Sequence, residues 1–103
     1  MSALEDIQKY APGASPAVVA ELERVYALAL QDADARLVSY SDSAELALVR
    51  ENFVKSKLGV TESDAAIDEA IAIVGDRVPG RKQRLTVYYL LAAHYGKLGV
   101  FGG

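Results

Sequence analysis

An uncharged segment, LTVYYLLAAHY, runs from Leu85 to Tyr95 and limits the folds that this chain can adopt. On a helical wheel both sides of the segment are apolar, and a helix that is apolar all round is usually buried all round. The segment is far shorter than the ~20 residues that a membrane-spanning helix needs. It is therefore predicted to be the central helix of a folded domain, running from about Arg81 to Lys97.

Amphipathic helices are predicted around this central helix, because apolar residues recur at intervals of three and four along the rest of the chain. Pro12-Gly13 and Gly59 serve as stop signals, and Ser15-Pro16 is a start signal. Residues 32–43, DADARLVSYSDS, have the composition of a connector. The four surrounding helices are expected at residues 3–11, 16–31, 43–58 and 62–78.

Two of these helices have the spacing of a capping box at their start. Asp42 precedes Glu45 by three residues, and Thr61 precedes Asp64 in the same way. The predicted fold class is all-α, a compact bundle of about five helices in one domain that spans residues 1–103. Residues 99–103 are expected to form a flexible tail, with Phe101 tucked back onto the body.

Composition excludes several kinds of chemistry. The chain has no cysteine, so it has no disulfide, thiolate nucleophile or cysteine metal site. It also lacks HExxH, GxGxxG and Walker patterns. The acidic start, with Glu5 and Asp6, is wrong for a secretory signal. These observations favour a non-enzymatic protein of the bacterial-type cytoplasm, with no cofactor, no metal and no membrane association.

Charge is distributed unevenly along the chain. Residues 1–76 hold fourteen acids and six bases, a net charge of −8, whereas residues 77–103 hold five bases and no acid, a net charge of +5. Four of the bases form a basic cluster around a Pro-Gly turn. These four are Arg77, Arg81, Lys82 and Arg84.

The basic cluster allows two interpretations. Cations in the first turn of a helix are unfavourable unless an anion is near, so the fold itself is expected to offset them in part, with the rest exposed to solvent. The alternative is anion or nucleic-acid binding at the start of the last helix. The acidic net charge of −3 and the apolar character of that helix count against binding in a DNA groove.

The side chains that could support catalysis have simpler explanations. His94 is the single histidine, and on an apolar helix it is expected to be a core or interface residue; a small-molecule site beside it is the other interpretation. Asp32 and Asp34 are expected to cap turns. The three serines of the connector are explained in the same way. They are Ser39, Ser41 and Ser43.

Six tyrosines outnumber two phenylalanines, which suits positions between a core and an interface. A central helix that is apolar on both sides could bury its second side against another copy of the chain. The expected function is therefore protein interaction, including homo-oligomer formation. The expected interface residues are Tyr88, Leu91, His94, Tyr95 and Phe101.

Two segments resemble a known family. SYSDSAELALVRENFVKSKLGV (39–60) and KQRLTVYYLLAAHYGKLGVF (82–101) are similar to small bacterial proteins catalogued as a domain of unknown function, the DUF2853-type family. The resemblance covers nearly the whole chain. It implies a small helical domain without an assigned activity, and no catalytic residue is carried over.

Overall fold

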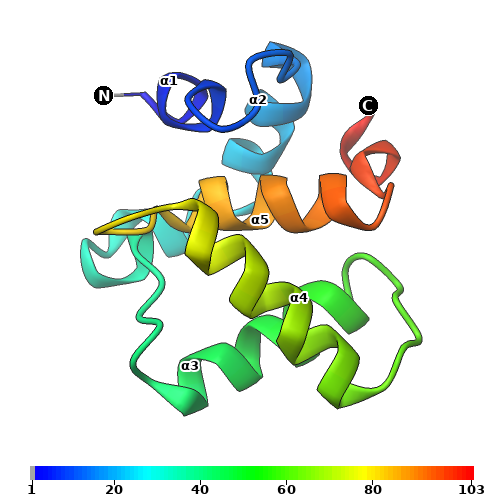
Figure 1. Cartoon of the computed structure of the whole chain (residues 1–103). Coiled ribbons are helices and arrows are strands. Elements are labelled where there is room, and N and C mark those ends of the chain that lie inside the picture. Colours follow the sequence, from blue (N-terminus) through cyan, green and yellow to red (C-terminus); the bar gives the residue numbers. More distant parts are fainter. Residues whose placement is uncertain (1) are drawn as a thin grey trace.

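The computed structural model describes residues 2–103 and confirms an all-α fold (Figure 1). Met1, the first residue of the predicted domain, lies outside the described residues. Within residues 2–103 the β pairing is limited to one isolated antiparallel bridge, between Leu37 and Gln83. The elements are α1 (Ala3–Gln8), α2 (Pro16–Val25), η1 (Ala29–Gln31), η2 (Asp34–Arg36), α3 (Ser43–Leu48), η3 (Val49–Lys55), α4 (Asp64–Arg77), α5 (Arg84–His94) and η4 (Leu98–Phe101).

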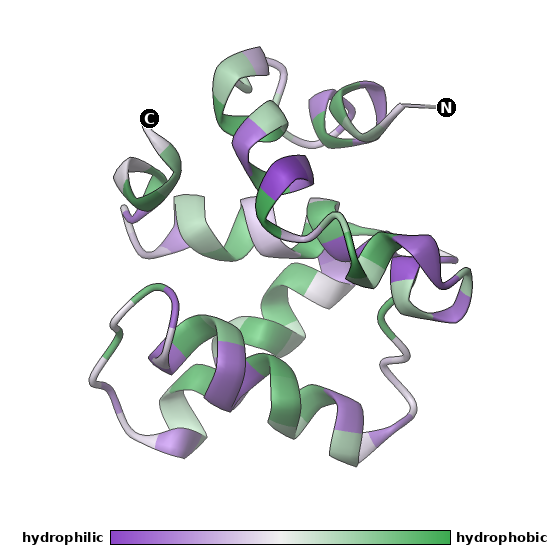
Figure 2. Ribbon diagram, turned by 180° about the vertical axis from the view of Figure 1, so that it is seen from behind, coloured by the Kyte–Doolittle hydropathy of each residue, from purple (hydrophilic) through white to green (hydrophobic). Residues whose placement is uncertain are grey.

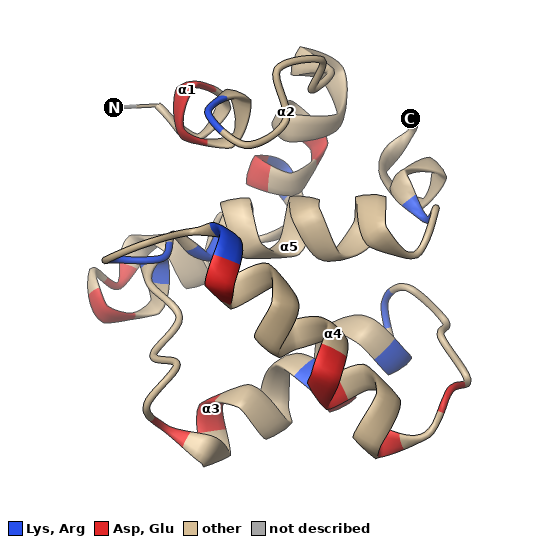
Figure 3. Ribbon diagram, in the orientation of Figure 1, with Lys and Arg blue, Asp and Glu red and all other residues tan. Residues whose placement is uncertain are grey.

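Helix α5 is the central helix, as predicted. Every residue from Leu85 to Ala92 is buried. It lies between a layer formed by α1, α2 and η4 and a layer formed by α4 and η3 (Figure 1). Figure 3 shows α5 free of acidic and basic residues beyond its first turn. Its apolar character is thus explained by packing within the same chain.

Helices α1, α2 and α4 each pack one side against α5. Helix α2 buries Val18, Val19 and Leu22, whereas its charged residues Glu21, Glu23 and Arg24 lie outside the core; Figure 2 shows this mixture of hydrophobic and hydrophilic positions along the helices. In α4 the predicted stripe is confirmed, because all of its members are at most 1% exposed. They are Ile67, Ile71, Val74 and Val78.

A buried polar pair joins α1 to α5. Thr86 is fully buried, and its hydroxyl donates a hydrogen bond of 2.5 Å to the carboxylate of Asp6, which is 8% exposed. Thr86 is the third residue of α5, so the Asp6 carboxylate lies beside the positive end of the helix dipole. Asp6 therefore supplies part of the negative charge that the cation-rich start of α5 requires.

The predicted second helix is too long. Helix α2 ends at Val25, and residues 29–31 form the separate 3₁₀ turn η1. The chain turns at Tyr26, whose ring packs edge-on against Tyr88, with centroids 5.1 Å apart, and also contacts Phe53 at 6.2 Å. Because the ring of Tyr26 packs against Phe53 and Tyr88, the backbone leaves the axis of α2 at this residue.

The predicted third helix has two parts. Helix α3 ends at Leu48, and the seven residues of η3 form a π-helix. The amide of Ser56 donates to the carbonyl of Glu51, five residues earlier. This wider turn buries residues five apart, since Val49 and Val54 both face the core.

The predicted capping boxes are corrected in detail. Asp42 caps α3 by accepting hydrogen bonds from the amides of Ala44 and Glu45, but the Glu45 side chain turns away to Arg84. Helix α4 is capped by Ser63, which accepts from the Ala66 amide. The predicted cap at Thr61 is therefore wrong by two residues.

Helix α5 starts at Arg84, three residues later than predicted. Gly80, with a φ of +71°, completes the turn after α4. The following residues are extended and pair with the connector, because the amide of Val38 donates to the carbonyl of Lys82. The segment predicted as a tail forms η4, and Phe101 is buried as expected.

Candidate interaction surface

The basic cluster does not form one binding surface. Arg77 donates a hydrogen bond to the carbonyl of Tyr10, and Lys82 donates to the carbonyl of Gly80 while its ammonium lies 5.4 Å from the centre of the Tyr40 ring. Arg81 is exposed. Arg84 is largely enclosed by the fold.

Arg84 is a structural residue that ties the connector and α3 to α5. Its guanidinium forms an ion pair with Glu45, donates to the carbonyl of Ala35 at 2.5 Å and donates to the hydroxyl of Tyr88 at 3.0 Å. The side chain of Arg84 is 13% exposed and that of Glu45 is 21% exposed. Burial opposes the charge of Arg84, but Tyr88 and Glu45 outweigh burial and raise its pKa.

The predicted interface residues fall into two groups. Tyr88, Leu91 and Phe101 are buried within the chain, and Phe101 stacks 6.3 Å from Phe53. His94 is exposed rather than in the core, and Tyr95 is half-buried; their rings meet edge-on at 4.9 Å. The second side of α5 is therefore covered by the chain's own helices, which removes the reason for predicting self-association through it.

The connector residues have local structural roles. The Asp32 carboxylate accepts a hydrogen bond of 2.9 Å from the Asp34 amide, and the hydroxyls of Ser39 and Ser41 are 3.3 Å apart. Ser43 is the first residue of α3. Within residues 2–103 no cluster of three or more histidine, aspartate and glutamate side chains has an arrangement suited to a metal ion.

A groove between α3 and α4 is the surface feature best suited to a partner. We call it the α3–α4 groove, and its volume is about 450 Å³. Its floor is apolar, with Leu46 and Ala47 from α3 and Ile71 and Ala72 from α4. Because Ala47 and Ala72 are small, the two helices leave a hollow between them that a larger side chain could occupy.

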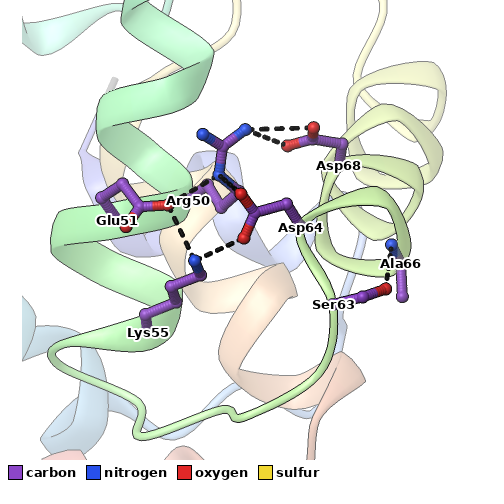
Figure 4. Close-up of polar contacts among 7 residues, drawn as sticks. All are labelled: Arg50, Glu51, Lys55, Ser63, Asp64, Ala66 and Asp68. Carbon is purple, nitrogen blue, oxygen red and sulfur yellow. Dashed lines mark hydrogen bonds and ion pairs between the residues drawn. The ribbon is translucent and has the colours of Figure 1, made fainter.

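One end of the groove is closed by an ion network (Figure 4). Arg50 donates two hydrogen bonds, of 3.0 and 3.1 Å, to the carboxylate of Asp68. It also pairs with Glu51, and Lys55 bridges Glu51 and Asp64. The network fixes α4 to the π-helix.

The same contacts shift the pKa values of Glu51, Asp64 and Arg50. Hydrogen bonds from Arg50 and then Lys55 lower the pKa of Glu51, and the hydrogen bond from Lys55 lowers the pKa of Asp64. The hydrogen bonds that Arg50 makes to Glu51 and Asp68 raise its own pKa. All of these groups therefore hold their charges more strongly than free side chains.

Tyr40 forms the other end of the groove. Its hydroxyl donates a hydrogen bond of 2.9 Å to the carbonyl of Ile71. Its ring lies on Gly75, where an added β-carbon would be 2.3 Å from a ring carbon. Burial raises the pKa of Tyr40 to about 12, and the negative charge of Asp76 adds to the shift.

Sequence reasoning missed this groove. Its floor combines residues from two segments some 25 positions apart, and neither alanine signals a surface hollow. Gly75, a glycine inside a regular helix, was the one available signal, because such glycines often permit a close approach. That signal indicates a packing partner, but it does not say that Tyr40 is the partner.

These features define a small all-α domain with an open groove on its outer layer. The chain belongs to the family described as "Protein of unknown function (DUF2853)", whose model matches residues 2–99. This confirms the resemblance seen in segments 39–60 and 82–101. No curated protein matches the chain. None of the helices in residues 2–103 combines the length and apolarity that a membrane crossing requires.

Proposed function

We propose that this domain is a non-enzymatic protein-interaction module whose α3–α4 groove binds a segment of another protein. The observation that carries the proposal is the apolar floor of the groove, formed by Leu46, Ala47, Ile71 and Ala72 between the Arg50–Asp68 pair at one end and Tyr40 at the other. Grooves between two helices commonly accept an amphipathic helix that places apolar side chains on the floor.

The charges around the groove indicate the chemistry of the partner. Residues 61–76 contain five acids and no base. Two of these acids line the groove: Asp68 is paired with Arg50, whereas Asp76 makes no ion pair within residues 2–103. A segment with apolar residues on one side and lysine or arginine at its edges would complement both the floor and the acidic rim.

The other two functions considered from the sequence have less support. Anion or nucleic-acid binding by the basic cluster has less support because Arg84 pairs with Glu45 within the fold. A small-molecule site beside His94 has less support because His94 lines none of five surface pockets found in residues 2–103.

Photo-crosslinking tests the proposal. A photoreactive amino acid replaces Ala72, on the groove floor, or Ala20, an exposed residue of α2 that serves as the matched control. Crosslinking is carried out in cells that express the chain, and products are identified by mass spectrometry. We expect a discrete protein partner at position 72 and not at position 20. Equal products at both positions would contradict the proposal.

The same experiment decides whether the partner is a second copy. A homodimer through the groove would give crosslinks between two identical chains, and sedimentation of the purified protein would show a dimer. We expect a different protein, because Arg84 and the apolar residues of α5 are enclosed within the fold and cannot enter the groove of a second copy.

A further inference from the structure

A second pocket, distinct from the α3–α4 groove, lies where the connector meets α2 and the start of α5. Its volume is about 380 Å³, and it is lined on its apolar side by Leu30, Leu37 and Leu85. Leu85 is only 3% exposed, so the floor of this pocket reaches the core of the domain. Polar side chains from three different elements complete the lining: Glu23, Arg36 and Gln83.

The two charged residues of the pocket are held apart. Glu23 belongs to α2 and Arg36 to η2, and within residues 2–103 neither has an ion-pair partner within 4.0 Å. By contrast, Glu21 and Arg24 on the same helix pair with each other. Both side chains are exposed to water, and they place an unpaired carboxylate and an unpaired guanidinium at the edge of the apolar floor.

Arg36 is oriented by the fold. Its Nε donates a hydrogen bond of 2.5 Å to the carbonyl of Leu30, which also lines the pocket. A guanidinium has five N–H donors, so this bond leaves its terminal nitrogens able to bind an external acceptor. A guanidinium held in this way is suited to a carboxylate, which can accept two parallel hydrogen bonds.

We propose that this pocket binds a free amino acid with an apolar side chain. The ligand's ammonium pairs with Glu23, its carboxylate pairs with Arg36, and its side chain packs on Leu30 and Leu85. Both charged side chains are exposed to water, so a ligand that carries one charge of each sign gains both pairs, whereas a purely apolar ligand gains neither. The volume is near the lower end of small-molecule pockets, which suits a ligand of amino-acid size.

Gln83 adds a further polar group. Its backbone is fixed by the bridge to Leu37, so its amide side chain extends from a defined position at the rim. It can donate to the ligand's carboxylate or accept from its ammonium. This inference is independent of the proposed protein-binding function, because the two pockets share no lining residue.

Calorimetric or NMR titration of the purified chain tests the inference with four probes: leucine, N-acetylleucine, leucinamide and trileucine. N-acetylleucine lacks the ammonium, and leucinamide lacks the carboxylate. We expect saturable binding of leucine and at least about ten-fold weaker binding of either modified compound, about the loss expected for one charge-assisted hydrogen bond. Trileucine carries both charges at opposite ends of a longer backbone, and tighter binding of trileucine would overturn the proposal in favour of a peptide terminus.

Three variants assign the charges. Glu23→Gln should remove the preference for leucine over N-acetylleucine, and Arg36→Gln should remove the preference for leucine over leucinamide. Glu21→Gln is the matched control on α2 and should retain both preferences. The proposal is overturned by an absence of saturable leucine binding to the folded chain, by equal binding of the three leucine compounds, or by equal effects of Glu21→Gln and Glu23→Gln.

Discussion

The ring of Tyr40 rests directly on Gly75, so closely that a β-carbon on residue 75 would lie 2.3 Å from ring carbon Cε2. This contact places the connector against α4 and forms one end of the α3–α4 groove. Any side chain at residue 75 must displace the ring, and with it the hydrogen bond from the Tyr40 hydroxyl to Ile71.

Gly75→Ala is therefore expected to destabilise the fold. Alanine is favoured over glycine inside a helix by up to ~1 kcal/mol, but overpacking costs about 1–3 kcal/mol and should prevail. Chemical denaturation measures the difference. In a Tyr40→Ala background the steric conflict is gone, so Gly75→Ala should become neutral or stabilising. Equal destabilisation in both backgrounds would show that the ring is not the cause.

Stability should fall at alkaline pH. The pKa of Tyr40 is raised from 10.0 to about 12, chiefly by burial. The neutral phenol is thus favoured in the folded state, and its contribution is complete below pH 10 and is lost as the pH rises through 12. Denaturation from pH 9 to pH 12 should show this decline, with a shallower slope for Tyr40→Phe. An unchanged slope would contradict the assignment.

Loss of the Arg84 partner should destabilise the junction of α3, the connector and α5. Glu45→Gln leaves a largely buried guanidinium without its carboxylate, and the expected cost is about 1–2 kcal/mol after allowance for partial exposure. Glu21→Gln, which breaks the exposed pair with Arg24, should change stability by less than ~0.5 kcal/mol. A similar loss in both variants would indicate that Arg84 is adequately solvated.

The ion network should contribute to stability above acidic pH and in low salt. The pKa of Glu51 is lowered from 4.5 and that of Asp64 from 3.8. The charged form of each carboxylate therefore stabilises the folded state, and this contribution is complete at a pH above those values. Their contribution is lost as the pH falls through the lowered pKa values. In Lys55→Gln the denaturation midpoint should fall less steeply as the pH is lowered, and added salt should have the same effect in the parent chain.

The sequence predicts what depends on local periodicity. The uncharged segment from Leu85 to Tyr95 indicates the central helix, and the spacing of Ile67 and Ile71 indicates the buried side of α4. These predictions are confirmed because a buried side must carry apolar residues wherever the helix lies in the fold.

What depends on distant partners is not predicted. Helix α2 stops at Val25 because the Tyr26 ring joins an aromatic cluster with residues 53 and 88. Arg84, predicted within a cationic surface, finds its anion 39 positions earlier at Glu45. The groove likewise depends on the packing of α3 against α4, which no single segment encodes.

Binding in the α3–α4 groove is tested most directly with the partner segment that crosslinking identifies. That segment is purified on its own, without a crosslink, and its affinity is measured for three forms of the chain. The forms are the parent chain, Ala72→Arg, which fills the groove floor, and Ala20→Arg on exposed α2. Denaturation midpoints confirm that all three fold. We predict at least about ten-fold weaker binding, or ~1.4 kcal/mol, for Ala72→Arg and unchanged binding for Ala20→Arg. Equal affinity of Ala72→Arg and the parent chain would contradict it.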